Sequence, residues 1–215
     1  MIPTATEIAA WANKRETQAL VPILLRRLIH GSLSRVTMIG FPGGDSVQLG
    51  GFDGTLQVEV GNAWVPDGKS LWESGCNKGV KHKADSDYEK RTKKVRRPDR
   101  LQSTFVFVTP RRWTSKDMWA VGRRSERKWK DVRCLDADDL EQWLERSPSA
   151  STWLTETIGS PSSGFTSGAR YWDLWANACD LPLPTSLILA GREDAARAFA
   201  RRHERASRQP HYDLR

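Results

Sequence analysis

Two acidic residues and a group of lysines stand in the stretch from residue 50 to residue 91. Asp53 lies in the glycine-flanked sequence GGFDG, and Glu73 comes at the end of the short apolar run SLWES. Lysine-rich sequence begins soon afterwards, at Lys78. Two carboxylates that meet at neighbouring strand ends can hold a divalent metal ion, and a nearby lysine can position or deprotonate a water molecule. Asp53 and Glu73 are therefore candidate catalytic residues, and candidate ligands of Mg²⁺ or Mn²⁺, for phosphodiester cleavage.

A strongly basic segment follows these two acids. Between Lys78 and Arg100 the sequence contains ten basic and four acidic residues. We expect residues 80–94 to form a mostly solvated helix whose cations contact the phosphate backbone of a nucleic acid. A helix with ordinary pairs of opposite charge four residues apart would look the same in sequence. The candidate nucleic-acid-binding residues are Lys81, Lys90, Arg91, Lys93, Lys94, Arg96 and Arg97.

The composition of the chain favours a polyanionic partner. The 215 residues carry a formal net charge of +8, and the sequence pI is about 9.7. These values suit DNA binding, although they also describe a generally basic protein. The three cysteines are far apart and form no CxxC pair, which favours a reducing cytoplasm over a disulfide framework. No signal sequence and no long apolar run is present, so we expect a cytoplasmic protein with no membrane partner.

Local patterns predict helices and strands through the first half of the chain. Thr4 followed by Glu7 is typical of a capping box, which would open a short helix ending near residue 14. Apolar residues that recur every four positions predict an amphipathic helix over residues 16–30, bent or restarted at Pro22 and capped by Gly31. The predicted strands cover residues 35–41, 46–53, 55–60 and 70–74, with Gly54 as a tight-turn residue.

The strongest strand signal is the run FVFVT at residues 105–109. It is apolar on both faces, as expected of a buried central strand in a sheet that is covered on both sides. Residues 113–130 are predicted to hold a helix after a loop, and residues 131–135 a short strand. Asp136 is the predicted N-cap of an acidic helix. The expected fold class is α/β, with a central mixed β-sheet flanked by helices on both faces.

Tryptophan is unusually frequent, with ten residues in the chain. Most of them stand beside polar or charged residues. We expect these large rings to cap the edge of a modest core, and stacking on nucleic-acid bases is the alternative. Trp113, Trp119, Trp129 and Trp143 are the examples of tryptophans beside polar or charged residues.

A Ser-, Gly- and Pro-rich stretch at residues 160–168 predicts a domain boundary. We therefore expect one domain over residues 1–158 and a linker over residues 159–168. Residues 169–215 would form an incomplete C-terminal segment, partly disordered, because one strand and one helix are too few to bury a core.

The order of these elements and several short motifs resemble the PD-(D/E)xK nuclease core found in many restriction endonucleases. GFDG with Asp53 and LWESG with Glu73 are similar to the two acidic motifs of Mrr-like domains, and FVFVTP resembles the core strand that follows. The order FPGG, GGFDG, VPDG, WESG, DYEKR is also similar to a nuclease-like domain at the N-termini of large bacterial proteins, some linked to phage defence. The resemblance covers roughly residues 15–155. It implies a Mg²⁺-dependent DNA endonuclease and leaves homodimer formation open.

One position departs from the motif of this family. The motif places a lysine two residues after the glutamate, and this chain has Gly75 there. A lysine on the following helix could replace it, because one helical turn brings a long side chain back over the strand end. Lys83 is the first candidate for this catalytic role and Lys78 the second. The carbonyl of Ser74 could add a metal ligand.

Two other functions remain open in the sequence. Gly75 also suits a catalytically inactive nuclease fold that binds nucleic acid or mediates assembly. A basic RNA-binding protein is the third alternative, although no aromatic RNA-stacking motif supports it. The histidines are scattered and the glycine-rich FPGGDSVQLGG lacks GxxxxGK[ST], so no nucleophilic triad and no small-molecule cofactor is expected.

Overall fold

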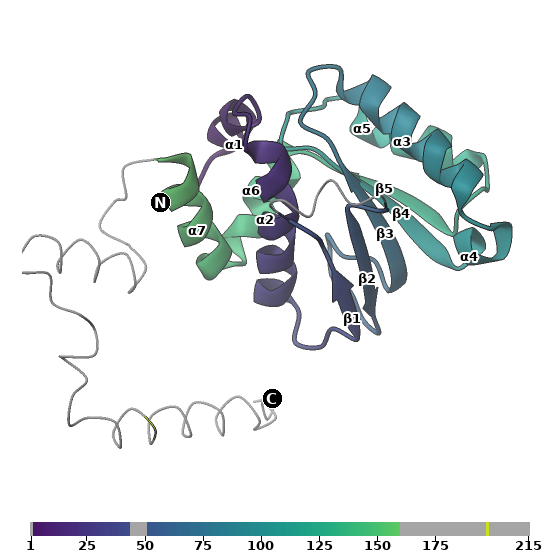
Figure 1. The fold of residues 1–215 in the computed structure, drawn as a ribbon, viewed down its shortest axis with the longest axis horizontal. Coiled ribbons are helices and arrows are strands. Elements are labelled where there is room, and N and C mark those ends of the chain that lie inside the picture. Colours follow the sequence, from purple (N-terminus) through teal and green to yellow (C-terminus); the bar gives the residue numbers. More distant parts are fainter. Residues whose placement is uncertain (1, 44–50, 160–196, 198–215) are drawn as a thin grey trace, which may run out of the picture. The chain divides into compact units, whose positions relative to one another are not determined.

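The structure is a computed structural model that describes residues 2–43, 51–159 and Arg197. Five strands and seven helices lie in this part of the chain (Figure 1). The strands are β1 (Met38–Gly40), β2 (Gly54–Val58), β3 (Gly68–Ser74), β4 (Ser103–Val108) and β5 (Asp131–Leu135). The helices are α1 (Ala5–Trp11), α2 (Thr17–Ser32), α3 (Val80–Lys94), α4 (Arg97–Leu101), α5 (Lys116–Ser125), α6 (Ala137–Glu145) and α7 (Pro148–Ile158).

The strands form one mixed sheet in the order β1-β2-β3-β4-β5. β1, β2 and β3 are antiparallel neighbours, whereas β3, β4 and β5 run parallel. Helices α1, α2, α6 and α7 lie on one side of the sheet, and α3 and α5 lie on the other (Figure 1). The predicted α/β fold with a mixed sheet between two helical layers is confirmed.

The interior strands β3 and β4 supply both faces of the core. All six residues of β4 are buried, as its continuous apolar sequence predicted. Because side chains alternate along a strand, Val106 packs under α2 and α6 while Phe105 packs under α3. In β3 the same alternation sends Trp72 to the first face and Leu71 to the second. Glu73 is two residues after Leu71, so its side chain also faces α3.

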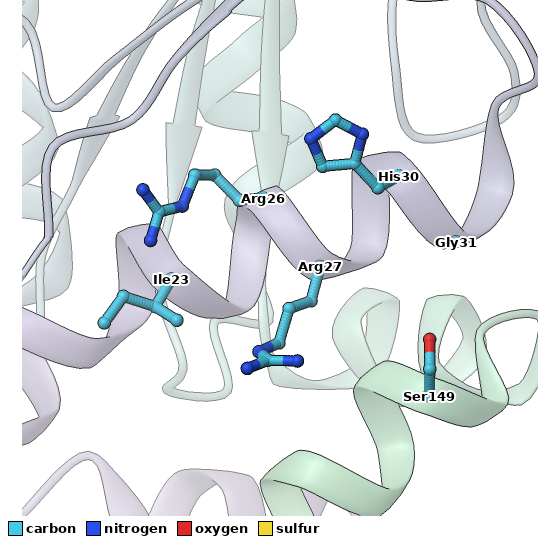
Figure 2. Close-up of a pocket in the computed structure, with 6 residues that line it drawn as sticks. All are labelled: Ile23, Arg26, Arg27, His30, Gly31 and Ser149. Atoms are coloured by element: carbon cyan, nitrogen blue, oxygen red, sulfur yellow. The ribbon is translucent and has the colours of Figure 1, made fainter. Parts of the chain in front are cut away.

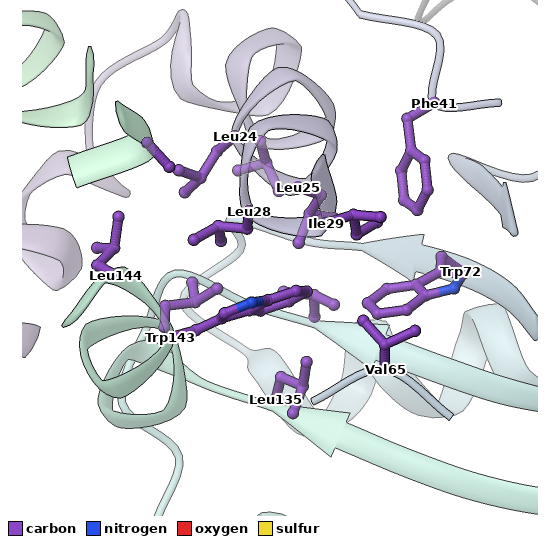
Figure 3. Packing of buried hydrophobic residues seen from close by; sticks show 14 of the residues in the cluster. Leu24, Leu25, Leu28, Ile29, Phe41, Val65, Trp72, Leu135, Trp143 and Leu144 are labelled. Carbon is purple, nitrogen blue, oxygen red and sulfur yellow. The ribbon is translucent and has the colours of Figure 1, made fainter. Parts of the chain in front are cut away.

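The larger cluster of buried residues lies between the sheet and the helices of the first layer. Figure 3 shows leucines of α2 above Trp72 and Trp143, with Leu135 beneath them. The indole of Trp143 stacks on that of Trp64, with ring centroids 5.7 Å apart. The other three tryptophans that the sequence assigned to the core are Trp113, Trp119 and Trp129. Like Trp143, each of them is at most 8% exposed, which supports a role in the core.

Local sequence explains where the first helices begin. The capping box at Thr4 and Glu7 is present, although α1 ends at Trp11 and not near residue 14. Pro22 lies within the first turns of α2, and the helix continues through it to Ser32. Gly31 is therefore not the helix cap. It lies within the last turn of α2, where an added Cβ would come within 3.2 Å of Ser147.

Gly54 also differs from its predicted role. It is the first residue of β2 and not a turn residue, and it pairs with Trp72 in the register of β2 with β3. A Cβ at this position would lie only 2.1 Å from Cε1 of Phe41, so the absence of a side chain makes room for that ring. Residues 51–53 of the predicted strand 46–53 are not in a strand, and the rest of it lies outside the described residues.

In the C-terminal half, β4, α5, β5 and α6 follow the predicted order, whereas the sequence did not predict α4 and α7. Asp136 caps α6 in a second capping box, in which it accepts from the backbone N–H groups of Asp138 and Asp139. Helix α7 ends at Ile158, and Gly159 follows it with φ +74°. The predicted linker beyond residue 159 and the C-terminal segment, apart from Arg197, lie outside the described residues. None of the described helices is both long and apolar enough to cross a membrane.

Candidate active site at the ends of β2 and β3

The two acids predicted as metal ligands come from neighbouring strand ends. Asp53 immediately precedes β2, and Gly54 pairs with Trp72 of β3, next to Glu73. The backbone N–H and the hydroxyl of Ser74 both donate to Oδ2 of Asp53, each at 2.8 Å. Ser74 thus fixes the orientation of the Asp53 carboxylate against the end of β3.

Glu73 is a buried acid with a cationic partner. Glu73 is only 3% exposed, and the Nε–H of Arg91 donates to Oε1 of its carboxylate. The pKa of Glu73 is raised to about 7. Burial is the largest cause, Arg91 lowers the pKa, and the negative charges of Asp53 and Asp87 raise it. A carboxyl group whose pKa is raised by burial beside other acids is common at catalytic and metal-binding sites.

The side chain of Lys83 crosses the position where the motif expects a lysine. Gly75 lies two residues after Glu73, so a side chain at residue 75 would stand on the same face of the strand. That space is filled by α3, because a Cβ on Gly75 would lie 2.7 Å from Cγ of Lys83 and 3.3 Å from its Cε. The Lys83 side chain therefore passes over Gly75, directly after the end of β3.

Asp87 holds the Lys83 amine in place. The Nζ atom of Lys83 lies 3.0 Å from Oδ1 and 2.9 Å from Oδ2 of Asp87. Asp87 is 5% exposed, and burial raises its pKa, with a further rise caused by Asp53. Lys83, Asp87 and Arg91 are spaced four residues apart, so they form one stripe along α3 that faces the two strand ends.

Arg91 connects three segments of the site. Besides Glu73, its guanidinium donates from Nη2 to the carbonyl of Gly51 and lies 4.6 Å from the ring centre of Phe52. Gly51 and Phe52 directly precede Asp53 in the chain. Arg91 therefore ties the segment that carries Asp53 to the strand that carries Glu73. It is 7% exposed, in contrast to the exposed phosphate-contacting position that its sequence context predicted.

Gln18 of α2 and Arg111 form hydrogen bonds with the backbone at the end of β3. The Gln18 side chain donates to the carbonyl of Ser74 at 3.5 Å and accepts from the N–H of Cys76 at 3.2 Å. Arg111 donates to the carbonyl of Cys76 at 2.6 Å. Burial raises the pKa of the Cys76 thiol to about 11, so this cysteine is a thiol at neutral pH and not a reactive thiolate.

The oxygen donors suit a hydrated Mg²⁺ ion better than a closed metal cage. Oδ1 of Asp53 and Oε2 of Glu73 make no hydrogen bond to any described residue. Mg²⁺ is commonly held by one or two carboxylates and keeps several of its waters. Within residues 2–43 and 51–159, no three His, Cys, Asp or Glu side chains are grouped as metal ligands. The two carboxylates thus suit Mg²⁺ that keeps most of its waters, whereas the Ser74 carbonyl, which the sequence predicts as a third ligand, accepts from the Gln18 side chain.

A hollow of about 600 Å³ lies at the start of α3, close in sequence to Lys83. Its cationic lining includes Lys78, Lys81 and Arg112, and the ring of Trp113 forms part of its wall. Lys81 is exposed and forms an ion pair with Asp85. Further along α3 and α4, the exposed candidate residues are Lys90, Lys93, Lys94, Arg96 and Arg97. The predicted nucleic-acid-binding cations are thus exposed, with Arg91 as the buried exception.

A second hollow, of about 540 Å³, lies between α2 and α7. Figure 2 shows Arg26, Arg27 and His30 of α2 on one side of it and Ser149 of α7 on the other. The Arg27 guanidinium lies 5.0 Å from the ring centre of Trp153. None of the residues that hold Asp53, Glu73 or Lys83 lines this hollow, so it is separate from the candidate active site.

The structure brings together Asp53, Glu73, Ser74 and Lys83 and leaves Lys78 on the exposed segment before α3. It adds Asp87 and Arg91 to the site, whereas the sequence predicted Arg91 for phosphate contact. Asp87 and Arg91 come four and eight residues after Lys83, and this spacing is the sequence signal that places all three on one face of α3. Comparisons of the chain with protein-family models, curated proteins and solved structures gave no match.

Proposed function

We propose that this chain is a metal-dependent endonuclease that hydrolyses phosphodiester bonds in DNA. The observation that carries the proposal is the path of Lys83, whose side chain fills the space above Gly75, two residues after Glu73. This arrangement supplies the three groups of the resembled motif, with the lysine contributed by a helix in place of the strand. The cytoplasm and phage defence are the setting that we propose for this activity.

Each residue of the site has a chemical task in this proposal. Asp53 and Glu73 would hold the metal ion, and Ser74 orients Asp53 through two hydrogen bonds. A bound Mg²⁺ would supply positive charge to the pentacoordinate phosphorus of the transition state and would lower the pKa of a coordinated water. The Lys83 ammonium group would position the attacking water by donating to it, and Asp87 fixes that group in place.

Plasmid cleavage in the presence of Mg²⁺ tests the proposal. We expect the wild type to nick and linearise the plasmid, and Asp53→Ala and Lys83→Met to lose at least about a hundredfold in rate, as is common for catalytic groups. Glu59→Ala is the matched control, because Glu59 is an exposed acid just beyond β2. Equal cutting by the wild type and Asp53→Ala would end the proposal.

A second candidate function is an inactive nuclease fold that binds nucleic acid or mediates assembly. The observation in its favour is the contact between Arg91 and Glu73, which occupies one of the proposed metal ligands. This function predicts salt-sensitive DNA binding, with no cleavage, that survives Asp53→Ala and Glu73→Ala. Loss of DNA binding together with metal binding in Glu73→Ala would count against it.

A further inference from the structure

Arg91 is the counter-charge of a buried metal-ligand candidate. Glu73 is 3% exposed and faces the negative charges of Asp53 and Asp87. An ionised carboxylate in such surroundings is costly unless a cation pairs with it. Among the described residues, Arg91 is the cation that forms a salt bridge with Glu73. Arg91 contacts Oε1 and leaves Oε2 without a hydrogen bond to a described residue. A divalent cation bound to this carboxylate would still lie close to the guanidinium, and the two positive charges would repel each other.

The contacts of Arg91 divide into two groups. The Nε–H donates to Glu73, whereas Nη2 donates to the Gly51 carbonyl and the guanidinium plane lies over Phe52. The second group does not involve any carboxylate. Arg91 could therefore lose its hydrogen bond to Glu73 while its contacts with Gly51 and Phe52 still hold the guanidinium.

We propose that Arg91 is a positioning residue that keeps Glu73 paired in the metal-free site, and that a divalent cation displaces it from Glu73 on binding. The inference rests on the proposed function, because it concerns the same metal site. It explains how the buried acids Glu73 and Asp87 can lie near the partly buried Asp53 when the metal is absent. Metal binding is then an exchange of one cation for another on Glu73, so Arg91 weakens the affinity for the metal.

Isothermal titration with Mn²⁺ alone tests this competition in the full chain. Loss of the guanidinium charge in Arg91→Gln should tighten Mn²⁺ binding between about fivefold and a hundredfold, the usual range for coupled binding events. Arg91→Lys keeps a positive charge and should stay nearer the wild type. Arg26→Gln is the matched control, since it removes the same charge from an exposed position on α2 and should leave the dissociation constant unchanged.

The outcomes separate this inference from the proposed function. If Arg91 only stabilised the fold, Arg91→Gln would loosen the segment before Asp53 and bind Mn²⁺ equally or more weakly, and this result would overturn the inference. If neither the wild type nor Arg91→Gln bound Mn²⁺, and the wild type did not cut DNA, the proposed function would fail and the inference would fail with it.

A measurement on the wild type covers the case in which Arg91→Gln does not fold. The Nε–H of a salt-bridged, buried arginine exchanges slowly and gives its own side-chain NMR signal. We expect the Arg91 signal to be present without metal and to shift or broaden as Mg²⁺ saturates the site. A signal that stays unchanged at saturating Mg²⁺ would show that Arg91 keeps its contact with Glu73, and would overturn the inference.

Discussion

The side chain of Lys83 fills the space that any side chain on Gly75 would need. A Cβ at Gly75 would stand 2.7 Å from Cγ of Lys83, which is closer than real Cβ contacts come. The backbone N–H of Gly75 donates to the carbonyl of Val108 at 3.0 Å, so β4 holds this glycine in place. The glycine and the lysine therefore depend on each other, since a larger residue at 75 would push Lys83 away from the acids.

This dependence predicts that Gly75→Ala harms activity more than stability. The added methyl group must displace the Lys83 stem, and we expect cleavage to fall by about tenfold to a hundredfold, as a misplacement of about 1 Å can cause. Gly122→Ala is the matched control, because a Cβ there meets nothing within 4 Å and Gly122 lies in α5. It should cut DNA normally and gain up to about 1 kcal/mol in helix stability. Normal cleavage by Gly75→Ala would contradict the prediction.

The Lys83–Asp87 pair predicts a stability effect that differs from the catalytic one. Lys83→Met leaves the carboxylate of Asp87 buried without its cation, which should lower the free energy of unfolding by about 1–2 kcal/mol, since Lys83 is partly exposed. Replacing both residues, as Lys83→Met with Asp87→Leu, should restore stability but not DNA cleavage. Urea denaturation and plasmid cleavage measure the two effects.

Lys81→Met is the control for this pair. Lys81 is largely exposed, and its partner Asp85 is also held by Arg123 and Trp119. We expect this substitution to change the free energy of unfolding by less than about 0.5 kcal/mol. If the double substitution were as unstable as Lys83→Met alone, the unpaired Asp87 would not be the cause.

The raised pKa of Glu73 predicts a stability that decreases as the pH rises. The pKa of Glu73 is about 7 in the folded chain, against 4.5 for an ordinary glutamate. Between these two pH values the folded state binds more protons than the unfolded state, so the free energy of unfolding falls as the pH increases. The full effect is on the order of 3 kcal/mol and is complete above about pH 8.

Glu73→Gln isolates this contribution, because glutamine does not ionise. The difference in unfolding free energy between Glu73→Gln and the wild type should grow in favour of the variant from about pH 4.5 to pH 8. Chemical denaturation at several pH values, without divalent metal, measures it. Glu59→Gln serves as the control, since Glu59 is exposed. A difference that does not vary with pH would show that burial does not raise the pKa of Glu73.

Local sequence predicted the elements well, because their signals lie within a few residues. The apolar run of β4, the capping box of α6 and the bounds of α3 all depend on neighbouring side chains. Sequence also placed Asp53 and Glu73 together, because consecutive antiparallel strands end side by side. The position of Arg91 could not be predicted in this way. Its contact with Glu73 depends on how α3 lies across β3, which is set by the packing of Tyr88 on Phe105 and Trp119.

Glycine gave the least reliable signals, for a related reason. Gly54 follows Phe52 and Asp53 in a turn-like sequence, yet it begins a strand. The ring of Phe41 occupies the space that a side chain at this position would need. Gly31 looked like a helix cap, yet α2 continues past it and packs it against Ser147. In both cases the cause is a contact with a residue distant in sequence. The departure at Gly75 has the same physical origin, in the approach of Lys83.

Asp136 joins β5, α6 and the loop before α5, so we expect it to be a main determinant of stability. It is 2% exposed, caps α6, accepts from the N–H of Trp113 at 2.9 Å and pairs with Lys116 at 2.8 Å. These hydrogen bonds hold its pKa below the usual value of an aspartate. Asp136→Ala removes the cap and leaves Lys116 with Asp139 alone, which should cost about 2–4 kcal/mol in unfolding free energy.

Denaturation of two further variants in guanidinium chloride separates the contribution of the helix cap to stability from that of the ion pair with Lys116. Asp136→Ser keeps a capping oxygen and loses the charge, so it should lie between Asp136→Ala and the wild type. Asp138→Ala is the control, because Asp138 is half exposed and pairs with an exposed Arg112. It should lower stability by less than about 1 kcal/mol. A loss in Asp136→Ala no larger than in Asp138→Ala would mean that α6 does not depend on its buried cap.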